Sequence, residues 1–506
     1  MSYSPNLSSA FNDTRMRSGQ TSFSGMCSLC SEHCVGTCEI GLSAIRGEIA
    51  VYPTNSGDNQ VASEKIMPVD YSHFNINGRV FGAAGIEADA DQATIFNVKL
   101  ERTIGRLHPV RVAMPVVLPA VIKLDWKDYF AGAAMAGVIC VIGENALGKF
   151  KDVEYRDGKV VRFESLKEIF DSFRRYDRGY GQIVLQCNWE DNARGLPEYA
   201  IREAKADAIE FKFGQSAKGT QPAVRIRTLE EALKQQENGA IVYPDPSNPK
   251  IQEAYGKKAC PNFFSYSRLP MWTEEYLKER IEELRAMGLK NVYFKMAGFD
   301  RADMERVLRI AASCHVDMVT FDGAGGGSGY SPCKMMNEWG YPAILIEAAL
   351  APVCRQMEAE GLMLPDLAIA GGFTMEDQVY KALALGAPYV KAVGLCRAPM
   401  AAAMNGKKIG ELLEEGNFPP HIQKYGSTKE EIFADLSELR WLYGERADQF
   451  AAGAIGVYSY LKRIAFGLQH FAALNRKFDV SRIDASDLIP LTREAKEILG
   501  GTWFSR

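Results

Sequence analysis

Short β-rich runs alternate with helical stretches between His108 and about residue 400, and this alternation constrains the fold more than any other feature. Each run is bounded by glycine or polar residues, as is typical of parallel strands buried on both faces. The eight runs are Met114–Ile122, Val138–Ile142, Gln182–Cys187, Ala208–Phe213, Asn291–Met296, Asp317–Phe321, Asp366–Ala370 and Tyr389–Val393. Amphipathic stretches such as Thr273–Met287, Ala302–Ser313 and Met375–Leu385 lie between them. Repeated βα units predict an α/β protein, and eight strands favour a closed (β/α)8 TIM barrel over the alternative, an open doubly wound sheet.

The rest of the chain divides around this barrel. Residues 1–105 are irregular and predict an N-terminal extension, whereas residues 106–476 contain the barrel. Within the barrel, residues 214–270 are longer than an ordinary βα loop and predict an insertion. Residues 451–475 predict one long helix with an apolar face, and residues 477–506 predict a C-terminal tail that wraps back over the body.

Charge and hydropathy exclude several classes of partner. The chain has 59 Lys and Arg against 63 Asp and Glu, so it has no basic field for nucleic acid or anionic lipid. Residues 1–25 lack the apolar core of a secretion signal, and the longest apolar run, Tyr129–Gly143, is shorter than the roughly 18–20 residues of a membrane span. We therefore expect a cytoplasmic protein with reduced cysteines.

A dense cysteine motif lies near the N-terminus. Cys27, Cys30, Cys34 and Cys38 give the spacing C-x2-C-x3-C-x3-C, out of eleven cysteines in the chain. Cysteine thiolates are the ligands of iron–sulfur clusters, and a compact run can place several of them around one cluster. We predict a [4Fe–4S] cluster here; the alternative is zinc, whose structural sites more often combine two separated pairs.

Two glycine-rich segments follow predicted strands. FDGAGGGSGYSP (321–332) matches neither the dinucleotide fingerprint nor the P-loop, but it lets a backbone approach a ligand closely. The second segment, AIAGGF (368–373), precedes a helix and the next run, YVKAVG. Gly371, Gly372 and Gly394 therefore lie where barrels bind phosphate, after strands 7 and 8. Together the two segments predict a phosphorylated cofactor.

Two lysines and a cysteine lie at predicted strand ends. Lys295 ends NVYFK, and Lys212 lies near the end of IEFKFG. At the top of a barrel strand a lysine would stabilise an anionic flavin or a substrate carboxylate, the alternative being a lysine that only snorkels to the surface. Cys187 and Asn188 are further candidates for substrate contact.

Four segments carry a resemblance to a known family. They resemble the FMN-binding domain of glutamate synthases, and the C-terminal helix and GGTWFSR ending resemble its stand-alone members, which include the large subunit of methylamine–glutamate N-methyltransferase. The segments are IEFKFGQSAKG (209–219), FKMAG (294–298), GAGGGSGYSP (323–332) and GGFTMEDQVYKALALGAPYVKAVG (371–394). The resemblance covers roughly residues 106–500.

The resemblance implies a barrel that binds FMN at its C-terminal mouth, with Lys295 near N1 and O2 of the flavin ring. The residues that it assigns to FMN are Lys295, Gly326, Gly327, Ser328, Gly371, Gly372 and Gly394. The catalytic candidates are Lys212, Gln215, Lys218 and Cys187. The chain departs from the family in three loops. The family's GAKPGEGG corresponds here to SAKGTQPAV, its MSFGALS to VIKLDWK, and its DGGIRSG to AGGFTME. The clustered cysteines also differ, because they precede the barrel rather than follow it.

The implied activity is that of an FMN- and iron–sulfur-dependent oxidoreductase acting on CH–NH2 groups. Electrons would pass from a reduced cluster or partner through FMN to a small amino-acid or 2-oxoacid (imine) substrate, with glutamate synthesis as the leading reaction. The alternatives are a transferase subunit of the N-methylglutamate type and a catalytically diverged electron-transfer subunit. The expected partners are ferredoxin or a flavoprotein, in a homo-oligomer or a larger complex.

Overall fold

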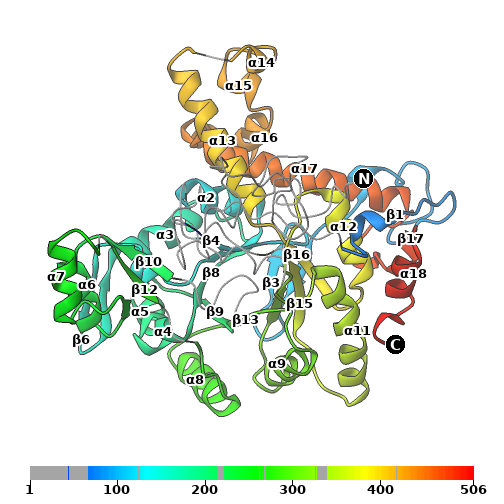
Figure 1. The fold of residues 1–506 in the computed structure, drawn as a ribbon. Helices are drawn as coiled ribbons and strands as arrows, with labels where there is room; N and C mark the ends of the chain where they lie inside the picture. The colour runs from blue at the N-terminus through cyan, green and yellow to red at the C-terminus, as the bar shows by residue number, and fades with distance from the viewer. Residues whose placement is uncertain are drawn as a thin grey trace, which may run out of the picture.

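The computed structural model describes most of the chain (Figure 1). The described residues are 67–121, 126–213, 222–260, 262–266, 269–324, 326, 339–417 and 419–505, together with residue 44. The predicted cluster ligands Cys27, Cys30, Cys34 and Cys38 lie outside them.

Eight parallel strands form a closed barrel in which neighbours in sequence are neighbours in space. They are β4 (Val116–Val121), β5 (Ile139–Ile142), β8 (Gln182–Cys187), β9 (Ala208–Lys212), β13 (Asn291–Ala297), β14 (Met318–Asp322), β15 (Asp366–Ala370) and β16 (Val390–Gly394). Each lies in, or within a residue or two of, one of the eight predicted runs. The (β/α)8 barrel is therefore confirmed, and the doubly wound alternative is wrong.

Alternate residues of each strand face the inside of the barrel. Near the amino-terminal ends these inward residues are apolar and include Val117, Val141 and Met318. The residues between them, such as Phe211 and Phe294, pack outward against the helices. Because both faces are buried, the strands appear in the sequence as nearly continuous apolar runs.

Helices surround the barrel (Figure 1). They include α2 (Trp126–Ala136), α3 (Glu164–Arg174), α5 (Leu196–Arg202), α8 (Glu274–Ala286), α9 (Arg301–Ser313), α11 (Ala343–Ala359) and α12 (Glu376–Leu385). The predicted long helix is α17 (Ala452–Leu474), which packs against α2, α12 and α13 (Arg397–Glu414). Gly406 and Gly456 allow α13 and α17 to pack closely. A Cβ at Gly406 would lie 2.6 Å from the carbonyl oxygen of Ala452 in α17, and a Cβ at Gly456 would lie 2.6 Å from that of Ala402 in α13. With α13, the short helices α14 (Pro420–Gln423), α15 (Lys429–Ile432) and α16 (Leu436–Tyr443) form a projection from the barrel (Figure 1).

A hairpin closes the amino-terminal end of the barrel. Its strands are β2 (Arg102–Ile104) and β3 (Val110–Val112), and Ile104 packs into the inner apolar cluster. The amide of Gly105 donates to the Asp366 carboxylate at 2.8 Å. The carboxyl-terminal end of the barrel is therefore the end available for a ligand, as in other barrels of this type.

The predicted insertion forms a small subdomain. Strands β10 (Pro222–Ile226), β12 (Phe263–Tyr266) and β11 (Ile241–Tyr243) form an antiparallel sheet in that order, with α6 (Leu229–Glu237) and α7 (Pro249–Gly256) beside it. A second hairpin, which the sequence did not predict, consists of β6 (Val153–Arg156) and β7 (Lys159–Phe163).

The C-terminal tail returns to the start of the described chain. Strand β17 (Leu488–Pro490) pairs antiparallel with β1 (Phe74–Ile76), and α18 (Arg493–Leu499) follows it. In the described part of the chain, no helix combines the length and apolar character needed to cross a bilayer.

Candidate active site

The inner face of the barrel changes from apolar to charged toward the carboxyl ends of the strands. Glu210 and Lys212 lie on β9, Lys295 on β13 and Asp322 at the end of β14. The strand register places Lys212 beside Lys295, and Lys295 beside Thr320. All four charged side chains are buried, with 2–3% of each residue exposed. Buried charges are costly unless they are paired, so the protonation state of each of these residues depends on the charges of the others.

Lys295 lies between two carboxylates. Its Nζ is 3.4 Å from Oδ2 of Asp322. Burial alone would lower the pKa of Lys295, but the negative charges of Asp322 and Glu210 outweigh burial and raise it. Burial raises the pKa of Glu210, against the opposing effects of Lys295, of Gln186, whose Nε2 donates to Oε1 of Glu210 at 2.5 Å, and of Lys212. Lys295 is therefore a fixed positive charge, and burial favours the neutral form of Glu210.

Lys212 faces the loop that follows β5. Its Nζ is 4.0 Å from Oε1 of Glu144. The amide of Glu144 in turn donates to Oε1 of Gln186 at 3.4 Å, which ties the loop to β8. The mouth therefore holds a second buried lysine whose carboxylate neighbour comes from a different loop.

A network of polar side chains fixes the loops after β5 and β8. Asn188 caps α4 (Trp189–Ala193), and Asp191 completes a capping box with it. The Asp191 carboxylate also accepts from the amide of Asn145 at 3.2 Å, and Asn188 donates to the Asn145 side chain at 3.0 Å. Burial raises the pKa of Asp191 to about 7. This network makes one side of the mouth rigid and places a titratable group in it.

Glycines form the opposite side of the mouth, after β14 and β15. A Cβ at Gly326 would clash with the Asp322 carboxylate. Gly371 has a φ of 111°, and a Cβ there would lie 2.8 Å from the amide nitrogen of Gly323. Only glycine suits these positions without strain, because the first has no room and the second also needs a left-handed backbone.

The next two glycines differ in their surroundings. Gly372 also has a positive φ, of 102°, but no heavy atom lies within 4 Å of where its Cβ would be. At Gly394, the last residue of β16, a Cβ would lie 2.7 Å from Cβ of Ala370 and 2.8 Å from Cγ of Pro119. The ends of β15 and β16 thus come together beside an open space bordered by backbone, which fits a ligand that is bound through main-chain amides.

The structure brings some of the predicted site residues together. Lys212, Lys295, Gly326, Gly371, Gly372 and Gly394 all lie at the carboxyl-terminal mouth of the barrel. Gln215, Lys218, Gly327 and Ser328 lie outside the described residues.

Cys187 does not join this group. Its side chain is fully buried in the apolar core around the barrel, next to Gln186, which faces inward. Burial raises the pKa of its thiol well above the usual value. We therefore correct the prediction: Cys187 packs outside the barrel and does not face the mouth.

Sequence reasoning missed four acidic residues of the site, among them Glu144 in the loop after β5. Glu210 had a clear signal, because it precedes Lys212 by two residues in IEFKF and so shares its face of the strand. Asp322 directly follows the apolar run that ends at Phe321. Asp191 had a weaker signal, since it follows the cap residue Asn188 by three positions, as in a capping box.

Comparisons with known proteins agree with the family resemblance over part of the chain. Residues 266–407, which include β13–β16, match the family model described as the conserved region in glutamate synthase. The predicted resemblance to that family is thus confirmed over this range. No curated protein matches the chain.

Solved structures similar to the chain have low sequence identity. The recombinant flavin-binding domain of baker's yeast flavocytochrome b2 is 13% identical, with a TM-score of 0.45 over 83% of this chain and 78% of that one. A variant of mandelate oxidase is 16% identical, with a TM-score of 0.42 over 81% of this chain and 86% of that one. (S)-Mandelate dehydrogenase is 13% identical, with a TM-score of 0.43 over 83% and 89%.

Proposed function

We propose that this chain is an FMN-dependent oxidoreductase that binds its flavin at the carboxyl-terminal mouth of the barrel. The observation that carries the proposal is the buried, protonated Lys295 beside a glycine-lined opening. Both features lie mainly in the segment that matches the conserved region in glutamate synthase.

The described residues fit the two ends of an FMN molecule. The ammonium group of Lys295 would hold the electron-rich edge of the flavin ring, and its positive charge favours the reduced, anionic form. Amides around Gly371 and Gly372 would hold the phosphate, since they border an open space after the seventh strand. When bound, FMN supplies transfer of an electron pair to or from a substrate beside it.

Two buried lysines at the mouth offer positive charge to a small anionic substrate. Glu144, Glu210 and Asp322 lie near Lys212 and Lys295, so the mouth has one more carboxyl than it has lysines. Burial raises the pKa of Glu210 and so favours its neutral form, which reduces this excess. Lys212 would then contact the substrate carboxylate. Asp191, whose pKa burial raises to about 7, can gain or lose a proton near neutral pH. A small amino acid or 2-oxoacid, bound as its imine, is the substrate class that suits this arrangement, and glutamate synthesis is its leading reaction.

We propose further that Cys27, Cys30, Cys34 and Cys38 bind a [4Fe–4S] cluster that passes electrons to the flavin, with zinc as the alternative metal. Among the described residues, no group of three or more His, Cys, Asp or Glu side chains is arranged to hold a metal. Ferredoxin or a separate flavoprotein is the proposed electron donor. The alternative function is a transferase subunit of the N-methylglutamate type, which the resemblance of the C-terminal helix α17 favours.

The test is anaerobic purification of the full chain, followed by assays of flavin, iron and acid-labile sulfide. We expect iron and sulfide in equal amounts, and re-oxidation of the reduced flavin by 2-oxoglutarate with ammonia. Lys212→Met should slow this re-oxidation at least about tenfold, because it removes a charge-assisted contact to the substrate. Lys290→Met, in an exposed ion pair with Asp207, is the control and should change nothing.

Each part of the proposal has its own contradicting result. Zinc without sulfide would overturn the cluster. Re-oxidation by methylamine adducts only would favour the transferase. A reduced flavin that no imine or oxoacid re-oxidises would favour the diverged electron-transfer subunit.

A further inference from the structure

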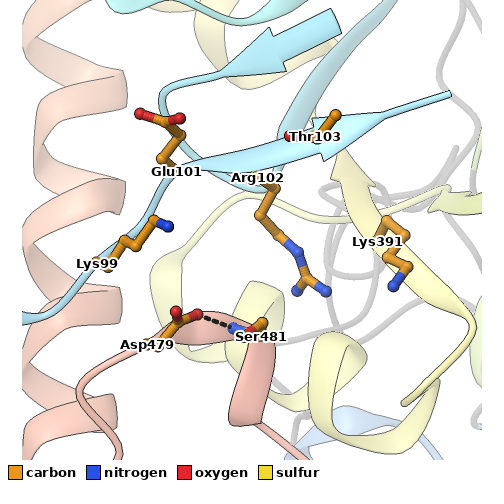
Figure 2. Close-up of a pocket in the computed structure, with 7 residues that line it drawn as sticks. All are labelled: Lys99, Glu101, Arg102, Thr103, Lys391, Asp479 and Ser481. Atoms are coloured by element: carbon orange, nitrogen blue, oxygen red, sulfur yellow. Dashed lines mark hydrogen bonds between the residues drawn. The ribbon is translucent and has the colours of Figure 1, made fainter. Parts of the chain in front are cut away.

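A pocket lies at the amino-terminal end of the barrel, away from the candidate active site. It has a volume of about 270 Å³ and opens between strand β2, strand β16 and the short 3-10 helix η6 (Val480–Arg482) (Figure 2). Its walls therefore come from the closing hairpin, the last barrel strand and the C-terminal tail. Neither the family resemblance nor the proposed reaction uses this pocket.

Three cations line the pocket without a paired carboxylate. Among the described residues, neither Lys99, Arg102 nor Lys391 forms an ion pair, and the one hydrogen bond of the Arg102 guanidinium is to the carbonyl of Val480 at 3.4 Å. Burial lowers the pKa of Arg102. Burial also lowers the pKa of Lys391, and the positive charge of Arg102 lowers it further. The pocket thus brings like charges together at a cost in stability.

The nearby carboxylates cancel only part of these charges. Glu101 is held by two nitrogens of Arg111, at 2.9 and 3.0 Å, and by the hydroxyl of Tyr180 at 3.0 Å. Asp366, at the start of β15, accepts from the amide of Gly105, and its negative charge acts on both Arg102 and Lys391. Asp479 lines the pocket and accepts from the amide of Ser481 at 2.7 Å (Figure 2). Three cations therefore face two carboxylates, Asp479 and Asp366, for which the described residues show no ion pair, and the pocket keeps an excess of positive charge.

The position of Lys391 depends on an irregularity in the barrel. Leu367 of β15 pairs with Val390, but the next residue, Ala368, pairs with Ala392, so the register skips Lys391. A bulge of this kind re-aims a side chain. Figure 2 shows the Lys391 and Arg102 side chains extending into the same space. The barrel departs from regular pairing at the residue that adds a charge to the pocket.

We propose that this pocket binds a small dianion whose charge is on oxygen atoms, either a phosphate monoester or a dicarboxylate. Arg102 presents paired N–H groups that match the oxygens of a phosphate or carboxylate. Lys99 and Lys391 add point charges, and the hydroxyls of Thr103 and Ser481 are further donors at the rim. The volume is below that of most sites for drug-sized ligands, which limits the ligand to a few heavy atoms beyond the anionic groups. Such a ligand would link the hairpin, the barrel and the tail.

The experiment measures binding of inorganic phosphate and of glutarate by calorimetry and thermal shift. The full chain is used with FMN present, so that any phosphate site at the mouth is filled. We expect at least one probe to bind and to raise the melting temperature. Lys391→Met and Arg102→Gln should each weaken binding at least about tenfold, since each removes a charge-assisted contact. Lys290→Met, in an exposed ion pair elsewhere on the barrel, is the matched control and should bind as the wild type does.

The two probes separate the ligand classes. Binding of phosphate alone identifies a phosphate ester, and binding of glutarate alone identifies a dicarboxylate. The proposal is overturned if neither probe binds at about 10 mM, or if Lys391→Met and Arg102→Gln bind as tightly as the wild type. Loss of like-charge repulsion should leave Lys391→Met at least as heat-stable as the ligand-free wild type. If either variant does not fold, Lys99→Met, at an exposed position, replaces it and is judged by the same criterion.

Discussion

Substitution of Lys295 by methionine is the most informative perturbation of the buried charged layer. Methionine keeps the apolar stem of the side chain but removes the ammonium group, which lies 3.4 Å from Asp322. At this separation and an effective dielectric constant of about 20, the attraction between the two charges is about 5 kcal/mol. Part of the lost attraction is offset, because the variant no longer has to desolvate the lysine ammonium group. Removing one partner of a buried pair typically costs about 3–5 kcal/mol, so we expect the FMN-free protein to lose about 3 kcal/mol at pH 8.

The loss should depend on pH in a defined direction. Burial raises the pKa of Glu210, and Lys295 is the largest influence opposing that rise, so the variant raises this pKa further. A carboxyl group whose pKa is higher in the folded state than in the unfolded state reduces stability as pH rises through that interval. The folded variant therefore holds a proton on Glu210 up to a higher pH than the wild type does. The loss of stability should therefore be smaller at pH 5 than at pH 8.

Urea unfolding of the FMN-free wild type and variant at both pH values measures this loss. The matched control is Lys290→Met, whose exposed ion pair with Asp207 should contribute less than about 1 kcal/mol at either pH. The reasoning is refuted if Lys295→Met loses less than about 1 kcal/mol at pH 8, or if its loss is the same at both pH values.

Three further substitutions test other parts of the site. Gly371→Ala places a side chain at a φ of 111°, 2.8 Å from the Gly323 amide, so FMN affinity should fall at least about tenfold in a fluorescence titration. The control Gly416→Ala, with open space around its Cβ, should keep the wild-type affinity. Asp191→Asn removes a carboxyl whose pKa is raised to about 7, so the variant should gain stability relative to the wild type as pH rises from about 4 to about 7. Urea unfolding measures this, and a difference in unfolding free energy that does not change with pH would contradict it. Cys187→Ala should lower the free energy of unfolding by about 1 kcal/mol and leave FMN affinity unchanged, because Cys187 packs outside the barrel. A variant that loses FMN affinity would show instead that Cys187 belongs to the flavin site.

The barrel was predictable because a strand buried on both faces must be apolar along its length. The runs around Cys140 and Ile209 show this, and the order of the strands follows from their order in the chain. The hairpin β6–β7 was not predictable in this way. Its exposed residues, such as Glu154 and Arg156, have no apolar periodicity.

The location of a site residue was predictable where it depended on the residue's position within its own strand. Lys295 and Lys212 were found because strand ends lead to the mouth. Cys187 was misplaced because it also ends a strand but occupies the opposite face, and the two-residue period fixed by Gln186 would have shown this. Contacts between distant segments, such as Glu144 with Lys212, depend on how the loops pack and leave no pattern in the sequence.

Titration of the FMN-free full chain with FMN, followed by flavin fluorescence and by absorption at about 375 and 450 nm, tests the central claim most directly. The structure predicts one FMN per chain in the wild type and in Lys290→Met. It also predicts binding weaker by at least about tenfold in Lys295→Met and in Gly371→Ala. A wild-type chain that binds no FMN, or variants that bind it as tightly as the wild type, would contradict a flavin site at the mouth of the barrel.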